Sequence, residues 1–444
     1  MHFATAPTHG GFMNKLRLSV IIACATLLWS GLSAQTNLTV AAQSGVSLSK
    51  LSASVNVCGS VGQSDSSTTF PTVDLTNCPA DTVAPPPRKP WQPIKVIPTS
   101  TCVDWLLYHT NQGGNWGIFR FGELPDKPKA DNNISKGKGK GVVDMSPSRS
   151  PDNQWVAFAS NRTGNWEIYV GSIDGTIQQR VTYATTAANL TPMWSPDGKT
   201  ITFVSTRTGT RNLFAFDVTT GTETALTQDS ASSTNPYWSS DSSKLLYQSD
   251  SSGKWQITEL TLAGLSSKTL SDGTANDMNP AFSPDGKMIA FRSFRGGNGN
   301  NGVIMVMNSD GSKVTAISDA NGNALNQVWS ADSSLIAYQS SITGSGDIYV
   351  YQLSTGKTRR VTDNDVPDYS PTWRCNAPFI VFTSEIGGSP ALYQTSALPM
   401  NNRGVKPEDV NQLSFDTRWV DLFPENSPAV EDSSARVAMG IMPR

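Results

Sequence analysis

Short runs that alternate apolar and polar residues recur along most of this chain, and tight turns separate them. Residues 200–205 read Thr-Ile-Thr-Phe-Val-Ser, an alternation rich in β-branched and aromatic side chains. The turn Ser195-Pro196-Asp197-Gly198 precedes this run, and a second run follows at residues 212–217 after Thr208-Gly209. A period of two over five or six residues predicts β-strands that are joined by hairpin turns.

The unit of a turn followed by a strand appears six times at a nearly constant interval. Its turns begin at residues spaced 45, 44, 44, 47 and 44 positions apart, namely Ser150, Ser195, Ser239, Ser283, Ser330 and, in degenerate form, Arg374. A period of this size, built from short strands, indicates a β-propeller in which each repeat forms one four-stranded blade.

An upstream copy of the repeat at residues 105–119 matches the second and third strands but has no inner strand before it. Asp421-Leu422-Phe423-Pro424 resembles the start of an inner strand such as Asp144-Met145-Ser146-Pro147. We therefore expect residues 420–430 to complete this blade, which closes the ring and removes exposed sheet edges. The prediction is an all-β propeller over residues 102–430 with seven four-stranded blades, or alternatively six, closed by a C-terminal strand.

An aromatic residue stands before five of the turns. These residues are Trp194, Trp238, Phe282, Trp329 and Trp373. Aromatic rings in this number suggest a ligand site, but each of them has the same phase in its repeat. Because every pair of neighbouring blades leaves the same wedge to fill, we expect the rings to pack in these wedges.

The consensus Ser-Pro-Asp-Gly-x-x-Ile-Ala-Phe-x-Ser, followed by Ile-Tyr-Val and Asp-Gly, resembles the TolB-type propeller repeat. Residues 168–175 and 305–311 are close matches, and the resemblance covers about three quarters of the chain. It implies the fold, and it implies less about function. Such propellers form the envelope protein TolB, which binds a lipoprotein partner, parts of prolyl-oligopeptidase-like peptidases, and some polysaccharide lyases.

Two departures from the TolB pattern limit what the resemblance implies. TolB has a smaller N-terminal α/β domain, whereas residues 35–100 of this chain are too few and too rich in Pro and Ser to match it. TolB is also six-bladed. Its partner-binding role is therefore not transferred to individual residues.

The N-terminal residues 1–34 have the pattern of a secretory signal peptide. Lys15 and Arg17 precede an apolar run of 12 residues, and small residues lead to a cleavage site after Ala34. The run is too short to span a bilayer, and translation begins at Met1 or Met13. The expected location is extracytoplasmic: periplasmic, cell-surface or secreted. An alternative reading places a lipid anchor on Cys24.

Residues 35–101 are rich in Ser, Thr and Pro, which predicts a stalk or linker, and residues 431–444 are expected to form a flexible tail. In an exported chain, Cys58 and Cys78 are expected to form a disulfide, because no His or further Cys lies near them. Cys102 and Cys375 stand at equivalent turns of neighbouring blades. They are expected either to form a latch or to remain free thiols.

Composition argues against several kinds of chemistry. The formal net charge is −2 with scattered basic residues, so nucleic acid is not an expected partner. Only His109 follows the signal segment, which argues against a His-rich zinc site, and no calcium loop or Gly-x-Ser-x-Gly motif is present. No metal or cofactor is predicted. Lys136, Lys138 and Lys140 alternate with glycine, which we interpret as a solvated loop.

The candidate binding face is the one that carries the loops between second and third strands and the connections between blades, because varied loops on a rigid scaffold usually carry binding. Its candidate residues are Arg162, Arg207, Arg295, Asp277, Asp365 and Asp368. We expect an exported, non-catalytic propeller that binds a protein or glycan partner at the cell envelope. The alternatives are a lyase or hydrolase acting on polysaccharide in the central funnel, and an accessory module of a larger secreted machine.

Overall fold

The computed structural model of the chain describes residues 90–98, 106–110, 115–121, 133–184, 186–295, 301–374, 379–388 and 390–397, together with five short strands elsewhere. The chain divides into two units, Met1–Arg88 and Lys89–Arg444. In the first unit, the described residues form a small sheet with the order β1 (Leu38–Thr39), β3 (Thr72–Asp74) and β2 (Ser60–Val61). No helix in the described part of the chain is long and apolar enough to cross a bilayer.

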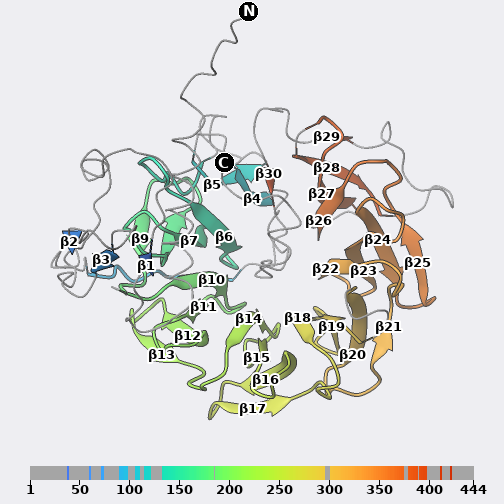
Figure 1. Cartoon of the computed structure of the whole chain (residues 1–444), viewed down its shortest axis with the longest axis horizontal. Coiled ribbons are helices and arrows are strands. Elements are labelled where there is room, and N and C mark those ends of the chain that lie inside the picture. The colour runs from blue at the N-terminus through green and yellow to red at the C-terminus, as the bar shows by residue number, and fades with distance from the viewer. Residues whose placement is uncertain are drawn as a thin grey trace, which may run out of the picture. The chain divides into compact units, whose positions relative to one another are not determined.

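Six four-stranded antiparallel sheets make up most of the second unit, and we call them blades A to F in chain order. Within each blade the strands pair in the order of the sequence, with the first strand innermost in the ring (Figure 1). The strands of blades A, B and C are β6 (Asp144–Arg149), β7 (Trp155–Ser160), β8 (Glu167–Ser172), β9 (Gln178–Arg180), β10 (Asn189–Trp194), β11 (Thr200–Ser205), β12 (Asn212–Asp217), β13 (Glu223–Ala225), β14 (Ser233–Trp238), β15 (Lys244–Ser249), β16 (Gln256–Thr261) and β17 (Ser266–Thr269). The strands of blades D, E and F are β18 (Asp277–Phe282), β19 (Met288–Ser293), β20 (Val303–Asn308), β21 (Thr315–Ala316), β22 (Ala324–Trp329), β23 (Leu335–Ser340), β24 (Asp347–Gln352), β25 (Lys357–Arg360), β26 (Asp368–Trp373), β27 (Phe379–Ser384), β28 (Ala391–Ser396) and β29 (Asn411–Gln412).

A seventh sheet, which we call the closing sheet, joins the two ends of the ring. It contains β30 (Asp421–Leu422), β4 (Leu106–Thr110) and β5 (Gly117–Phe121), and β30 pairs antiparallel with β4. A single bridge between Phe119 and Asn133 stands where a fourth strand would lie. The predicted all-β propeller with a C-terminal closing strand is confirmed. Its six complete blades match the alternative count, and the seventh sheet has three strands.

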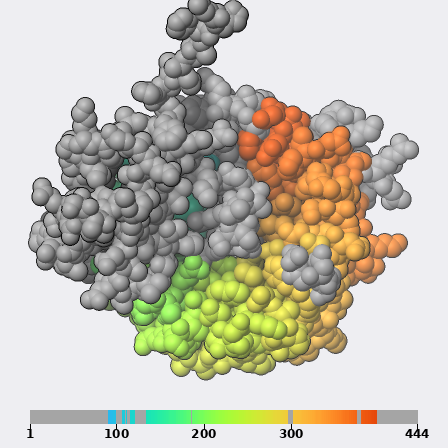
Figure 2. Space-filling model, in the orientation of Figure 1, coloured from blue at the N-terminus to red at the C-terminus, as the bar shows by residue number. Residues whose placement is uncertain are grey.

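The aromatic residues before the turns fill the wedges between blades, as predicted. Trp194 of blade B packs against Ile168 and Val170 of blade A. The indole Nε1 of Trp329 donates to the carbonyl of Ala281 in the preceding blade at 3.2 Å, and the indole of Trp373 makes the equivalent bond to Val328 at 3.1 Å. The space-filling view shows blades B to F as one continuous surface (Figure 2).

Every innermost strand of blades A to F bends at its third residue. This residue has a positive φ of 47–57° and is never glycine: Ser146, Thr191, Asn235, Asn279, Asn326 and Ser370. The pairing register with the second strand shifts at the same place in all six blades. In five blades a proline follows, which fits because a bulge leaves backbone groups outside the ladder and proline has no N–H to donate.

The antiparallel order of the strands gives the propeller two faces. The turns between first and second strands and the hairpins between third and fourth strands share one face, which we call the turn face. The loops between second and third strands and the connections between blades share the other, which we call the loop face. On the turn face of blades A to E, a serine hydroxyl donates to an aspartate two residues later at 2.6 Å, in the pairs Ser150/Asp152, Ser195/Asp197, Ser239/Asp241, Ser283/Asp285 and Ser330/Asp332.

Residues 90–98, which we call the strap, lie against the turn face of blades A and B. The Trp91 ring meets Phe216 edge to face at 4.8 Å, and its Nε1 donates to the carbonyl of Val218 at 2.8 Å. The backbone N–H of Ile94 donates to the same carbonyl at 3.1 Å, and the Ile94 side chain is buried. The last part of the predicted stalk is therefore packed on the propeller.

Candidate functional site

Three candidate arginines occupy the same position in their blades. Each stands two residues after the serine that ends the second strand, in blades A, B and D. The Nε of Arg162, Arg207 and Arg295 donates to that serine's hydroxyl at 2.8, 2.9 and 3.0 Å. This local bond aims each guanidinium back over its own blade, so its remaining donors meet acceptors of the same or the adjacent sheet.

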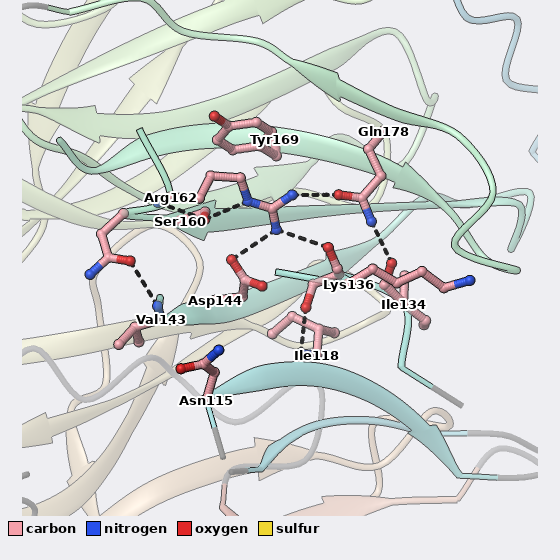
Figure 3. Close-up of polar contacts among 12 residues, drawn as sticks. Asn115, Ile118, Ile134, Lys136, Val143, Asp144, Ser160, Arg162, Tyr169 and Gln178 are labelled. Carbon is pink, nitrogen blue, oxygen red and sulfur yellow. Dashed lines mark hydrogen bonds and ion pairs between the residues drawn. The ribbon is translucent and has the colours of Figure 1, made fainter. Parts of the chain in front are cut away.

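Arg162 shows the arrangement most completely (Figure 3). Its Nη2 donates to the buried carboxylate of Asp144 and to the carbonyl of Ser135, both at 2.9 Å, and its Nη1 donates to the Gln178 side chain at 2.6 Å. The guanidinium also lies 4.6 Å from the centre of the Tyr169 ring, a cation–π contact. Because Ser135 follows the closing sheet, Arg162 links that sheet to blade A.

Arg207 makes the corresponding contacts in blade B with a different set of acceptors. Its guanidinium donates to Glu223 on the outermost strand and, at 3.1 Å, to the side-chain oxygen of Asn189 on the innermost strand. It covers the Phe214 ring at 4.4 Å. One arginine therefore connects the innermost and outermost strands of its blade.

Arg295 in blade D binds two carboxylates. It donates to Asp277, which is fully buried, and to both oxygens of the exposed Asp272 at 3.1 and 3.2 Å. Burial raises the pKa of Asp277, although Ser293 and Arg295 favour its ionised form. The backbone N–H of Thr274 instead lowers the pKa of Asp272. The cluster carries one more negative than positive charge when both acids are ionised.

The other two acidic candidates differ in their surroundings. Asp365 is exposed on the connection between blades E and F. Asp368 begins the innermost strand of blade F, is fully buried, and accepts from the Asn364 side chain at 2.7 Å. Burial raises the pKa of Asp368 to about 6. Only Asp365 of this pair can therefore reach a macromolecular partner directly.

Sequence reasoning placed these arginines on one face of the ring, as the structure does, but it missed the acceptors that hold them. Asp144, Gln178 and Asn189 are 16 to 18 residues from the arginines that they bind. A sequence pattern could have indicated these pairs. In blades A, B and D, a Ser-x-Arg motif at the end of the second strand occurs together with an Asp or Asn at the start of the innermost strand. The predicted disulfide residues Cys58, Cys78, Cys102 and Cys375, and the predicted lipid site at Cys24, lie outside the described residues.

The described side chains of this face interact mainly through ion pairs and hydrogen bonds. Among them, no group of three or more His, Cys, Asp or Glu residues is placed to hold a metal ion. Arg162, Arg207 and Arg295 are 17–30% exposed and hold the loops in place. The three arginines therefore fix the loops of this face, and the exposed charges lie on other residues of those loops.

Comparison with known proteins identifies the repeat. The family model described as the TolB beta propeller domain matches residues 130–333 and 264–417. No curated protein matches the chain in sequence.

Solved structures match the propeller at low sequence identity. The propeller domain of the Trilobed protease from Pyrococcus furiosus, described as having an open velcro topology, is 13% identical with a TM-score of 0.50, over 71% of this chain and 96% of that one. TolB from Acinetobacter baumannii is 18% identical with a TM-score of 0.44, over 72% and 82% of the two chains. An oligogalacturonate lyase from Vibrio parahaemolyticus is 15% identical with a TM-score of 0.48, over 67% and 83%.

Proposed function

This chain belongs to the TolB β-propeller domain family, and from that premise we propose that it is an exported, non-catalytic propeller that binds a protein or glycan partner at the cell envelope. We place the contact on the loop face. There Arg162, Arg207 and Arg295, with Asp277 and Asp368, position the loops, and exposed residues such as Asp365 make the contact.

The contrast between the two faces is the observation that supports this proposal. The turn face repeats one short hydrogen-bonded turn in five blades, with the serine and aspartate bonded to each other at 2.6 Å. The connections on the loop face differ from blade to blade in sequence and charge. Binding specificity usually resides in such varied loops on a rigid scaffold.

The strap supports the same orientation. Trp91 and Ile94 are held on the turn face of blade B, so the strap occupies that face and leaves the loop face uncovered by residues 90–98. If the preceding segment tethers the exported protein, the loop face is the side left accessible. A disulfide between Cys58 and Cys78 in that segment remains part of the proposal, and non-reducing peptide mapping of the mature protein tests it.

Blocking each face in turn tests the proposed function. A bulky polymer would be attached through p-azidophenylalanine at Ser252 on the loop face or, as the matched control, at Lys287 on the turn face; both positions are exposed. Capture of a macromolecule from an envelope extract should be lost with the polymer at Ser252 and retained with it at Lys287. If capture is instead lost with the polymer at Lys287 and retained with it at Ser252, the partner binds the turn face and the proposed binding face is wrong.

The enzymatic alternative is tested on the same preparation. The unmodified mature chain is incubated with acidic and neutral polysaccharides, and new reducing ends or unsaturated products are measured. Turnover that survives further purification of the protein would replace the binding proposal with a lyase or hydrolase.

A further inference from the structure

The connections between successive blades change charge systematically around the loop face. The connection from the closing sheet to blade A contains Lys136, Lys138 and Lys140, and the next connection, residues 181–188, has no charged residue. The four connections that follow are acidic, and their exposed carboxylates belong to Asp229, Asp272, Asp319, Asp363 and Asp365. Because these connections are equivalent positions of one repeat around a ring (Figure 1), the loop face has a basic side and an acidic side.

The lysine loop on the basic side is fixed by hydrogen bonds from two asparagine side chains. The Asn115 side chain, from the closing sheet, donates to the carbonyl of Gly139 at 2.7 Å and accepts from the N–H of Gly141 at 3.3 Å. The Asn161 side chain, from blade A, donates to the carbonyl of Gly141 at 3.2 Å and accepts from the N–H of Val143 at 2.7 Å. Two asparagines, one beside each of two neighbouring sheets, therefore hold residues 139–143 of the loop.

The glycines of this loop are needed for its shape. Gly139 and Gly141 have φ values of 111° and 83°, which side-chain-bearing residues rarely adopt. Lys138 and Lys140 alternate with them and are exposed. Neither lysine forms an ion pair with any residue that the structure describes, whereas the nearby Arg162 is paired with Asp144. The backbone thus presents two cations that have no counter-charge among the described residues.

Two of the five exposed carboxylates on the acidic side, those of Asp319 and Asp365, are candidates for contact with a partner. Asp319 and Asp365 are exposed, and among the described residues neither has a lysine or arginine within ion-pair distance. By contrast, Asp272 and Asp363 are paired with Arg295 and Arg360. Among the described residues, this face therefore has unpaired charges of both signs on different parts of its rim.

We propose that the loop face docks a folded protein with a polarised surface, whose acidic patch meets Lys138 and Lys140 and whose basic patch meets Asp319 and Asp365. This inference rests on the proposed function and specifies its partner. Opposite charges on one rim favour a single rotational orientation of the partner, because other orientations bring like charges together. A uniformly anionic glycan fits less well, since the acidic connections repel it along most of the rim.

Zero-length cross-linking tests the proposal directly. The full mature chain is treated with a carbodiimide in the presence of the protein fraction of an envelope extract, and the cross-linked peptides are mapped by mass spectrometry. We expect Lys138 or Lys140 joined to acidic residues, and Asp319 or Asp365 joined to lysines, of one and the same protein. Capture of a glycan, or links from only one side of the rim, would overturn the proposal.

Charge reversal supplies the quantitative test with the protein identified in that way. K138E/K140E should weaken its binding about tenfold or more at low ionic strength, with a smaller effect at high salt, and D319K/D365K should act similarly. The matched control is K313E/K357E, which reverses two exposed lysines on the turn face. Equal affinities for K138E/K140E and this control would refute the polarised dock.

The two levels of proposal fail in distinguishable ways. If the polymer at Ser252 leaves capture intact, the loop face is not the binding face and the proposed function is wrong. If the polymer blocks capture while both charge-reversal pairs bind like the wild type, the loop face binds but the polarised partner is wrong.

Discussion

At the scale of single residues, the loop face depends on arginines that are committed to acceptors in their own or the adjacent sheet. Arg295 illustrates the energetic consequence, because its partner Asp277 is fully buried. Removing the cation leaves an uncompensated carboxylate in the protein interior, which is costly even when the intact pair contributes little. The candidate binding arginines are therefore also determinants of stability.

We predict that Arg295→Ala lowers the free energy of unfolding by about 3 kcal/mol. The added change Asp277→Asn should recover part of this loss, because a neutral amide does not need the cation. Denaturant unfolding of the wild type, the single variant and the double variant measures both effects. An Arg295→Ala variant as stable as the wild type would show that the pair does not stabilise the blade.

A second prediction concerns pH. The pKa of Asp368 is raised from its ordinary 3.8 to about 6, because burial disfavours the charged form. The folded state favours the protonated carboxyl, so the contribution of Asp368 to stability is fully present below about pH 4. It is lost as the pH rises through 6. Asp368→Asn should be more stable than the wild type at pH 7.5, by up to about 3 kcal/mol, and the difference should vanish near pH 4.

The control for this pH effect is an aspartate with the opposite shift. The Ser239 hydroxyl, which donates to Asp241, lowers the pKa of that carboxyl to about 2. Its contribution is present above the ordinary pKa and is lost as the pH falls towards 2. Thermal melts from pH 2 to 8 should show that Asp241→Asn alters the acid limb and leaves the slope between pH 4 and 7 unchanged. A flat profile for Asp368→Asn would contradict the first assignment.

The positive φ at the third residue of each innermost strand gives a third prediction. Thr191 is β-branched, has φ 47°, and its hydroxyl has no hydrogen-bond partner among the described residues. Thr191→Gly should raise stability by about 0.5–1 kcal/mol, because glycine adopts this conformation without strain. Thr200→Gly, in a regular strand of the same blade, should lower stability. Equal effects of the two substitutions on the melting temperature would argue against strain at Thr191.

At the scale of elements, the sequence predicted the blades well because alternation and turn residues determine short strands locally. The wedge position of Trp194 also followed from repetition alone. The bends at Ser146 and Thr191 were not predicted, since serine and threonine do not signal positive φ. The pairing of Arg162 with Asp144 was missed because it depends on rotamers across a loop. The strap was assigned to a linker, because a proline-rich segment gives no periodic signal of packing.

The strap yields a prediction at this scale. Trp91→Ala removes the contact with Phe216 and the bond to the Val218 carbonyl, so we expect a loss of about 2 kcal/mol and faster proteolytic cleavage within residues 90–98. Ile97→Ala is the matched control, because that side chain is 60% exposed. Limited proteolysis and thermal melting report both quantities. Unchanged cleavage in the Trp91 variant would mean that other contacts hold the strap.

At the scale of the whole molecule, the ring depends on the pairing of β30 with β4. Deleting residues 420–444 removes the innermost strand of the closing sheet and exposes the edge of β4, which favours aggregation. We expect a large fall in melting temperature, measured by calorimetry together with light scattering. A truncated protein that melts at the wild-type temperature would show that closure contributes nothing to stability.

The closing pair also sets the order of events during biosynthesis. Asp421 pairs with Thr110, so the two partners are separated by more than three hundred residues. At ordinary rates of translation, roughly 15 to 60 seconds pass between their appearances at the ribosome. Blades A to F can form one after another in that interval, while the edge of β4 that pairs with β30 remains unpaired. The ring is thus open at this edge until β30 is synthesised, and whatever shields β4 during that time decides how many chains reach the closed ring.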